Sequence, residues 1–166
     1  MSSRSLDTLD PGTRQKADRF LSMADDAALD VLIYCTLRTK SEQAILYRQS
    51  RPLSTIKMKA QELSDTYGRS DLAKVLMDVG PQHGAHVTNA APGQSLHNYG
   101  YAFDGVPLRH GKPVWGTRSK DDLSLWGVYG DLADASGLEW AGHWKNFREF
   151  PHCQQSGIRW QELIRR

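Results

Sequence analysis

The fold is decided by the stretch from Val87 to Asp104, which reads VTNAAPGQSLHNYGYAFD. His97 and Asp104 stand seven residues apart in it, and an imidazole with a carboxylate is an ordinary ligand pair for zinc. On a straight strand, residues at this separation point to opposite faces. The chain must therefore turn or bulge between them if they share one metal, and Gly100 tolerates such a break most easily.

A second stretch, Glu149-Phe150-Pro151-His152, supplies a third ligand candidate and a carboxylate three residues before it. Pro151 removes a backbone donor and biases Phe150 toward extended geometry, so Glu149 and His152 are not a helical pair. The chain contains no His-Glu-x-x-His motif, which excludes the commonest zinc-protease pattern. Three ligands and one free acid are the makeup of a catalytic zinc site whose fourth position stays open for water.

Three segments then carry a resemblance to a known family: Ser95-x-His97-x-x-Gly100-x-Ala102-x-Asp104, Gly137-Leu138-Glu139-Trp140-Ala141-Gly142, and Pro151-His152. In residue type, spacing and order they resemble the D-alanyl-D-alanine carboxypeptidase and phage L-alanyl-D-glutamate endopeptidase family of zinc peptidases. These enzymes share a core with lysostaphin-type enzymes and the hedgehog signalling domain. The resemblance spans residues 29–153 and implies Zn²⁺ held by His97, Asp104 and His152, with Glu149 as the general base.

Arg38 stands where a predicted strand gives way to a helix. On sequence alone, a solvated surface arginine is the default interpretation. The segment Arg38-x-x-x-x-Gln43 is similar to the family's Arg-Ser-x-x-x-Gln segment, whose arginine faces the substrate, although Thr39 replaces the serine. The resemblance thus implies that Arg38 binds a substrate carboxylate or stabilises oxyanion charge, with Ser95 and Gln43 as substrate-binding or supporting residues.

Several other polar residues compete for these roles. His83, His86 and His143 have no carboxylate partner at a recognisable spacing, so they are left out of the ligand set. Glu139 is the alternative general base. His143 also stands where the family usually has aspartate, between a glycine and a tryptophan.

The two cysteines, Cys35 and Cys153, are expected to be free thiols because the N-terminus lacks the apolar core of an export signal. Cys153 adjoins His152, and the two would ligate one metal only if neighbouring residues pointed the same way. We therefore expect neither thiol to be a ligand.

Composition bounds the remaining possibilities. The 166 residues are 39 % hydrophobic and 24 % charged, which is typical of an ordinary globular protein. The net charge of +2 gives no support to nucleic-acid binding. No run approaches membrane-spanning length, so we expect a cytoplasmic protein without stable membrane association, and we expect it to be a monomer. The family resemblance implies bacterial peptidoglycan as its partner.

Local patterns predict helices mainly before residue 84 and strands clustered after it. Residues 1–166 are expected to form a single zinc peptidase domain, with a helical insertion at 50–84 that walls or covers the cleft. The predicted elements are a helix that Asp10 caps and that begins at Pro11; a strand within Leu29–Leu37; a helix from a Ser41 cap to about Gln49; helices around Ile56–Leu63 and from Ser70; a loop at Gly80–Gly84; two strands within Gly105–Trp115 joined by a turn at His110-Gly111; and a helix from Asp121 or Asp122 to Gly137.

These elements predict an α+β fold, with a small, mainly antiparallel sheet that carries the zinc and helices packed on its other side. The leading functional hypothesis is an endolysin-like peptidoglycan hydrolase that cleaves the stem peptide, at the L-alanyl-D-glutamate bond. The first alternative is a D-alanyl-D-alanine carboxypeptidase or dipeptidase. The alternative from another class is a non-catalytic zinc-containing binding module, against which Glu149 argues, because a structural zinc has little use for a free acid beside it.

Overall fold

The computed structural model describes residues 2–165, so Met1 and Arg166, the ends of the predicted single domain, lie outside the described residues. The chain divides into two compact units. We call Ser3–Leu37 with Gly100–Ile158 the sheet unit, and Arg38–Tyr99 with the segment that begins at Arg159 the helical unit. Among residues 2–165, no helix combines the length and apolar character needed to cross a membrane.

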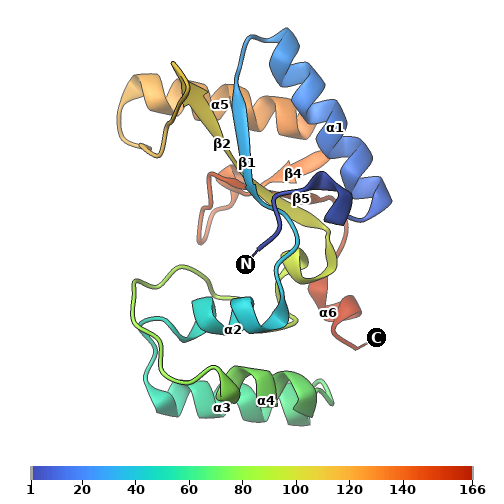
Figure 1. Ribbon diagram of the computed structural model, residues 1–166, viewed down its shortest axis with the longest axis vertical. Coiled ribbons are helices and arrows are strands. Elements are labelled where there is room, and N and C mark those ends of the chain that lie inside the picture. Colours follow the sequence, from blue (N-terminus) through green and yellow to red (C-terminus); the bar gives the residue numbers. More distant parts are fainter. Residues whose placement is uncertain (1, 166) are drawn as a thin grey trace. The chain divides into compact units, whose positions relative to one another are not determined.

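The five strands found within residues 2–165 all belong to the sheet unit (Figure 1). They are β1 (Val31–Cys35), β2 (Ala102–Arg109), β3 (Lys112–Pro113), β4 (Leu138–Trp140) and β5 (His152–Gln155). Their order is β1-β2-β5-β4, with β3 paired to β2, and every pairing is antiparallel. The predicted α+β fold with a small antiparallel sheet is confirmed.

The helices α1 (Pro11–Asp26) and α5 (Lys120–Ala135) supply much of the core of this unit, together with residues of the strands. The unit also contains the short 3₁₀ helices η1 (Leu6–Thr8) and η3 (Ala141–His143). Asp10 caps α1 and Pro11 occupies its first turn, as predicted. The cluster joins Phe20 of α1 and Tyr129 of α5, whose rings meet edge to face at 5.1 Å, with Phe103 of β2. Burial of each such side chain stabilises the fold by about 1.5–3 kcal/mol.

The two faces of the sheet have different characters. Phe103 and Cys153 contribute to the buried core that α1 and α5 cover. The next residue along β2, Asp104, and the residue that precedes Cys153, His152, therefore project to the opposite face. The helices thus pack on one side of the sheet and the polar candidates lie on the other, as the sequence predicts.

The helical unit contains α2 (Lys40–Arg48), α3 (Leu53–Asp65), α4 (Ser70–Asp78), the 3₁₀ helix η2 (Leu96–Tyr99) and the short α6 (Trp160–Leu163). Its own core includes Tyr47, Ile56, Leu63, Leu76 and Ile164. Two helices fill most of residues 50–84, which confirms the helical prediction for this segment.

Two local predictions need correction. Ser41 does not cap α2, because Thr39 accepts a hydrogen bond from the Glu42 backbone nitrogen while the Glu42 carboxylate accepts one from the Thr39 backbone, a complete capping box. The first strand after the central stretch begins at Ala102 rather than Gly105. The predicted turn at His110-Gly111 is confirmed between β2 and β3.

Candidate metal centre

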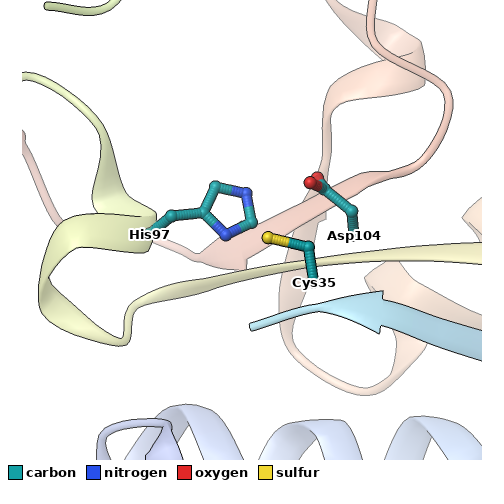
Figure 2. A group of neighbouring side chains, drawn as sticks. All are labelled: Cys35, His97 and Asp104. Carbon is teal, nitrogen blue, oxygen red and sulfur yellow. The ribbon is translucent and has the colours of Figure 1, made fainter. Parts of the chain in front are cut away.

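Three side chains form a row across the sheet, on the face away from the core. Asp104 on β2 is the register partner of Cys35 on β1 and of His152 on β5. Residues that lie opposite each other in an antiparallel ladder project to the same face. The Cys35 sulfur and an Asp104 carboxylate oxygen lie within 4.8 Å of each other, and Figure 2 draws these two side chains together with His97 of η2.

Asp104 and His152 fit a zinc ion. The His152 Nδ1 atom lies 3.3 Å from the Asp104 Oδ1 atom, and the two side chains are only 10 % and 13 % exposed. Two donors that each lie about 2.0–2.1 Å from a tetrahedral zinc are separated by about 3.3 Å. Imidazole nitrogen and carboxylate oxygen are also donor types that zinc accepts. Spacing and chemistry therefore agree with the sequence prediction for this pair.

The backbone before His152 is fixed by a turn. The His152 backbone nitrogen donates to the Glu149 carbonyl at 3.2 Å. The Pro151 carbonyl accepts from the Gly105 nitrogen and from the Tyr129 hydroxyl, each at 3.0 Å. The turn thus anchors the start of β5 to β2 and α5, and it confirms that Glu149 and His152 are not a helical pair.

Cys153 points away from this row. Its thiol is buried and donates to the Tyr129 hydroxyl at 3.4 Å, and burial raises the pKa of the Cys153 thiol. Both cysteines are free thiols, as predicted. Cys153 is therefore a core residue, whereas the position of Cys35 beside Asp104 is a feature that the sequence analysis missed.

His97 belongs to the helical unit, where it is 2 % exposed on η2. Its carbonyl accepts from the Arg38 nitrogen at 3.0 Å. Ser95, which is also buried, precedes η2 and accepts from the Asn98 nitrogen at 3.0 Å. The Asn98 amide in turn donates to the Arg38 carbonyl at 2.9 Å, so η2 and the start of α2 are held together.

The predicted break between His97 and Asp104 is present. After η2 the chain passes through Gly100, whose φ of +75° belongs to the left-handed region. A Cβ atom at this position would lie 2.9 Å from the Asp10 nitrogen and from the Thr8 carbonyl oxygen. Only glycine fits here, and the strand that carries Asp104 starts two residues later.

Arg38 and Gln43 are brought together. The Arg38 Nη1 atom donates to the Gln43 Oε1 atom at 3.0 Å, and the Gln43 amide donates to the Ala90 carbonyl at 2.7 Å. Gln43 is fully buried. Because both the oxygen and the nitrogen of this buried amide are hydrogen-bonded, Gln43 holds the Arg38 guanidinium in one place. This arrangement favours an ordered Arg38 over a freely solvated surface arginine.

Lys40 is a further residue of this region that the sequence analysis missed. Its Nζ atom donates to the Asn98 carbonyl at 2.8 Å and lies 3.9 Å from the centre of the Tyr99 ring. Burial, and secondarily the positive charge of Arg69, lower the pKa of Lys40 to about 8. Proximity to Arg38 in sequence is the only signal that pointed to it.

The two candidate bases have different surroundings. Glu149 is half-buried in the loop before β5, and its backbone nitrogen donates to the Ala141 carbonyl at 3.3 Å. Glu139 on β4 uses both carboxylate oxygens as acceptors, from Trp144 Nε1 at 2.7 Å and Gln154 Nε2 at 3.1 Å. Glu139 is thus committed to hydrogen bonds within the sheet unit.

The other histidines are surface residues. His143 is exposed and pairs with Asp134 at 3.2 Å. His86 is exposed and contacts the Asn89 amide oxygen at 2.8 Å, and His83 is exposed as well. His110 forms the β2–β3 turn with a φ of +53°. Their positions agree with leaving them out of the ligand set.

Comparisons with known proteins agree with the family resemblance seen in the sequence. Residues 88–155, which include all three predicted ligands and Glu149, match the family described as D-alanyl-D-alanine carboxypeptidase. The chain is 28 % identical over 150 residues to the peptidoglycan L-alanyl-D-glutamate endopeptidase CwlK of Bacillus subtilis (strain 168). The aligned region covers 88 % of this chain and 72 % of that protein.

Two solved structures are also similar. The vancomycin resistance D,D-pentapeptidase VanY, in complex with Zn(II), matches with a TM-score of 0.51 at 14 % identity, over 95 % of this chain and 79 % of that one. The L-Ala D-Glu endopeptidase ChiX of Serratia marcescens matches with a TM-score of 0.47 at 17 % identity, over 94 % of this chain and 89 % of that one. The likeness to VanY concerns the fold. The family match over residues 88–155 confirms the resemblance seen in the sequence to the D-alanyl-D-alanine carboxypeptidase family.

Proposed function

We propose that the chain is a zinc-dependent peptidoglycan hydrolase that cleaves the L-alanyl-D-glutamate bond of the stem peptide. The observation that carries the proposal is the Asp104–His152 pair, whose donor atoms lie 3.3 Å apart on the face of the sheet away from the core. The choice of bond is supported by the endopeptidase CwlK, to which the chain is 28 % identical. An endolysin is the biological setting that we propose for this activity.

The proposed zinc ligands are His97, Asp104 and His152. His97 enters through the motif Ser95-x-His97-x-x-Gly100-x-Ala102-x-Asp104, which lies within the matched family segment. When bound, zinc supplies a Lewis acid that lowers the pKa of a water molecule and polarises the scissile carbonyl. All ligands and the base come from one chain, so a monomer suffices.

The chain's own residues then divide the remaining work. Glu149 takes the proton from the attacking water and returns it to the departing amine, as a general base and then a general acid. Arg38, fixed by Gln43, binds the negative charge of a substrate carboxylate or of the oxyanion that develops at the carbonyl. Ser95 directly precedes η2, and its carbonyl accepts from the Asn98 nitrogen. We assign it a supporting role beside the substrate.

A D-alanyl-D-alanine carboxypeptidase is the second candidate, because the matched family segment carries that description. Both activities use the same ligands and base, and they differ in which end of the stem peptide the site accepts. A non-catalytic zinc module is the candidate from another class, and it predicts zinc binding without hydrolysis.

Digestion of purified peptidoglycan followed by mass spectrometry separates these candidates. The endopeptidase leaves L-alanine as the new carboxyl terminus on the muramyl side and D-glutamate as a new amino terminus on the released peptide. The carboxypeptidase instead removes a terminal D-alanine and leaves the rest intact. Intact stem peptides after incubation with zinc-loaded protein would support the binding module and overturn the proposal.

Metal analysis of single variants tests the ligand set. His97→Ala, Asp104→Ala and His152→Ala should each lose bound zinc and hydrolysis together. Cys35→Ser tests the competing ligand, because the Cys35 sulfur lies within 4.8 Å of an Asp104 carboxylate oxygen. The proposed ligand set predicts that this variant keeps both zinc and hydrolysis. Full zinc occupancy in His97→Ala, or loss of zinc in Cys35→Ser, would show that the ligand set is wrong.

A further inference from the structure

We propose that Glu139, Gln154 and Trp144 form a relay of hydrogen bonds that fixes which nitrogen of His152 carries the proton and so aims Nδ1 at the metal. The inference rests on the proposed zinc site. It gives these three residues positioning roles, since they act on the metal through His152.

The relay is continuous within the sheet unit. The His152 Nε2 atom lies 3.2 Å from the Gln154 Oε1 atom. The Gln154 Nε2 atom donates to the Glu139 Oε2 atom at 3.1 Å, and Trp144 Nε1 donates to the Glu139 Oε1 atom at 2.7 Å. Four side chains are thus joined end to end.

Strand register explains why these residues meet. Gln154 on β5 is the register partner of Glu139 on β4, so their side chains project to the same face of the sheet. His152 precedes Gln154 by two positions on β5 and shares that face. Trp144 completes the arrangement, because its ring also lies 5.6 Å from the His152 ring.

The proton positions follow from the chemistry of the groups. An ionised carboxylate only accepts hydrogen bonds, so Glu139 must face the NH₂ end of the Gln154 amide. The amide oxygen is then left to face His152 Nε2, and an oxygen acceptor requires that Nε2 carry a hydrogen. The relay therefore assigns the Nε2–H form to His152 from the single fact that Glu139 is a carboxylate.

The consequence appears at the other nitrogen. In the neutral Nε2–H form, the His152 Nδ1 atom presents a lone pair, and this atom is the one that lies 3.3 Å from Asp104. A lone pair beside a carboxylate is unfavourable unless a cation lies between them. Groups that orient a histidine ligand in this way typically contribute about 10- to 100-fold to metal affinity.

Zinc affinity and histidine NMR together test the relay. In ¹⁵N-labelled, zinc-loaded protein, His152 should show a protonated Nε2. Gln154→Leu removes the acceptor and should weaken zinc binding by about 10- to 100-fold in a chelator competition. Glu139→Gln should also weaken it, because the Gln154 amide is then free to turn and present an N–H to His152, which favours protonation at Nδ1.

An exchange of the two side-chain types distinguishes positioning from structural support. In the double variant Glu139→Gln with Gln154→Glu, the carboxylate at position 154 accepts from both His152 Nε2 and the amide at position 139. The amide oxygen at position 139 still accepts from Trp144. We expect the double variant to recover most of the zinc affinity that either single variant loses, and to restore the Nε2–H signal.

The outcomes separate this inference from the proposed function. Wild-type protein that binds no zinc would overturn the proposed zinc site itself. Zinc-loaded protein whose His152 is protonated at Nδ1, or a Gln154→Leu variant with unchanged zinc affinity, would leave that site standing and refute the relay. A double variant as weak as the single variants would also count against the relay.

Discussion

Glu149 is the carboxylate to which we assign the proton transfer, because it stands three residues before the proposed ligand His152. Glu149→Gln keeps the shape of the side chain and removes its basicity. We expect this variant to keep its fold and zinc, and to hydrolyse stem peptides about 10²- to 10⁴-fold more slowly. Turnover numbers measured beside the zinc content of the same samples check this.

The matched comparison is Glu139→Gln, for which we expect the main loss in zinc affinity rather than in the turnover of fully loaded protein. A folded, zinc-loaded Glu149→Gln protein that cleaves at a near-normal rate would sink the assignment. Attention would then turn to Glu139 as the base.

The second prediction concerns Arg38, to which we assign the binding of negative charge on the substrate or the oxyanion. Lysine keeps the charge but cannot reproduce the planar fork that donates to Gln43 Oε1. A charge-assisted hydrogen bond contributes about 1.5–3 kcal/mol, so Arg38→Lys should lower kcat about 10- to 100-fold while zinc stays bound. Arg14→Lys, at an exposed arginine that pairs with Asp7, is the control. Kinetics equal to those of the control would return Arg38 to a surface role.

Lys40 makes stability depend on pH. Burial lowers the pKa of Lys40 to about 8, whereas a lysine in the unfolded chain titrates at about 10.4. Between these values the unfolded state binds more protons, so the Lys40 contribution makes the free energy of unfolding rise with pH. Below pH 8 both states are protonated and the full penalty is present.

Urea unfolding of the wild type and of Lys40→Met from pH 7.5 to 10.5 measures this effect. Arg69, Asp71 and Tyr99 also interact electrostatically with this region, and they are common to both proteins. The wild type should therefore gain stability relative to the variant across the window. Two parallel curves would mean that the amine of Lys40 titrates alike in the folded and unfolded states.

Individual site residues differ in how far sequence could identify them. His97, Asp104, His152 and Glu149 could be predicted as site residues because motif spacing carries information about a shared metal, and their roles stay predictions. The roles of Gln154 and Glu139 depend on the register of β4 against β5, which no local pattern encodes. Lys40 likewise owes its low pKa to burial against segments distant in sequence.

At the scale of elements, the break between η2 and β2 depends on Gly100. Gly100→Ala combines a left-handed φ of +75° with a Cβ atom 2.9 Å from two backbone atoms. We expect it to lower the free energy of unfolding by about 2–4 kcal/mol, measured by urea unfolding, and to weaken zinc binding because β2 carries Asp104.

Gly68→Ala is the matched control for this prediction. Gly68 has a φ of +66° with no atom within 4 Å of the added Cβ, so it reports the backbone strain alone, about 1–2 kcal/mol. Equal losses in the two variants would show that the close contacts at Gly100 are relieved by a small backbone shift.

Elements with a strong helical period were predictable, whereas the shortest elements were not. Apolar residues at helical spacing and a proline in the first turn identify α1, and apolar stripes identify α3 and α4. The strand β4 has three residues and β5 has four, which is too short for a period to register. The cap of α2 was predicted at Ser41, and the reciprocal bonds between Thr39 and Glu42 place it at Thr39.

At the scale of the whole molecule, the chain forms two compact units with separate cores. It leaves the sheet unit after Leu37, returns at Gly100, and leaves again after Ile158. Periodicity reports local structure, so this grouping was outside the reach of the sequence. The single domain with an insertion at residues 50–84 stays a prediction.

Metal removal is the test at this scale, because the proposed ligands come from η2, β2 and β5. An ion that binds only the folded state stabilises it by RT ln(1 + [L]/Kd), about 2.7 kcal/mol at 100 times Kd. Treatment with a chelator should therefore lower Tm, and added zinc should restore it in a concentration-dependent way. His97→Ala should melt at the same temperature with or without zinc. The contrary outcome is a wild type whose Tm stays the same after the chelator has removed the zinc, as shown by metal analysis. It would mean that zinc is not held by these three elements together.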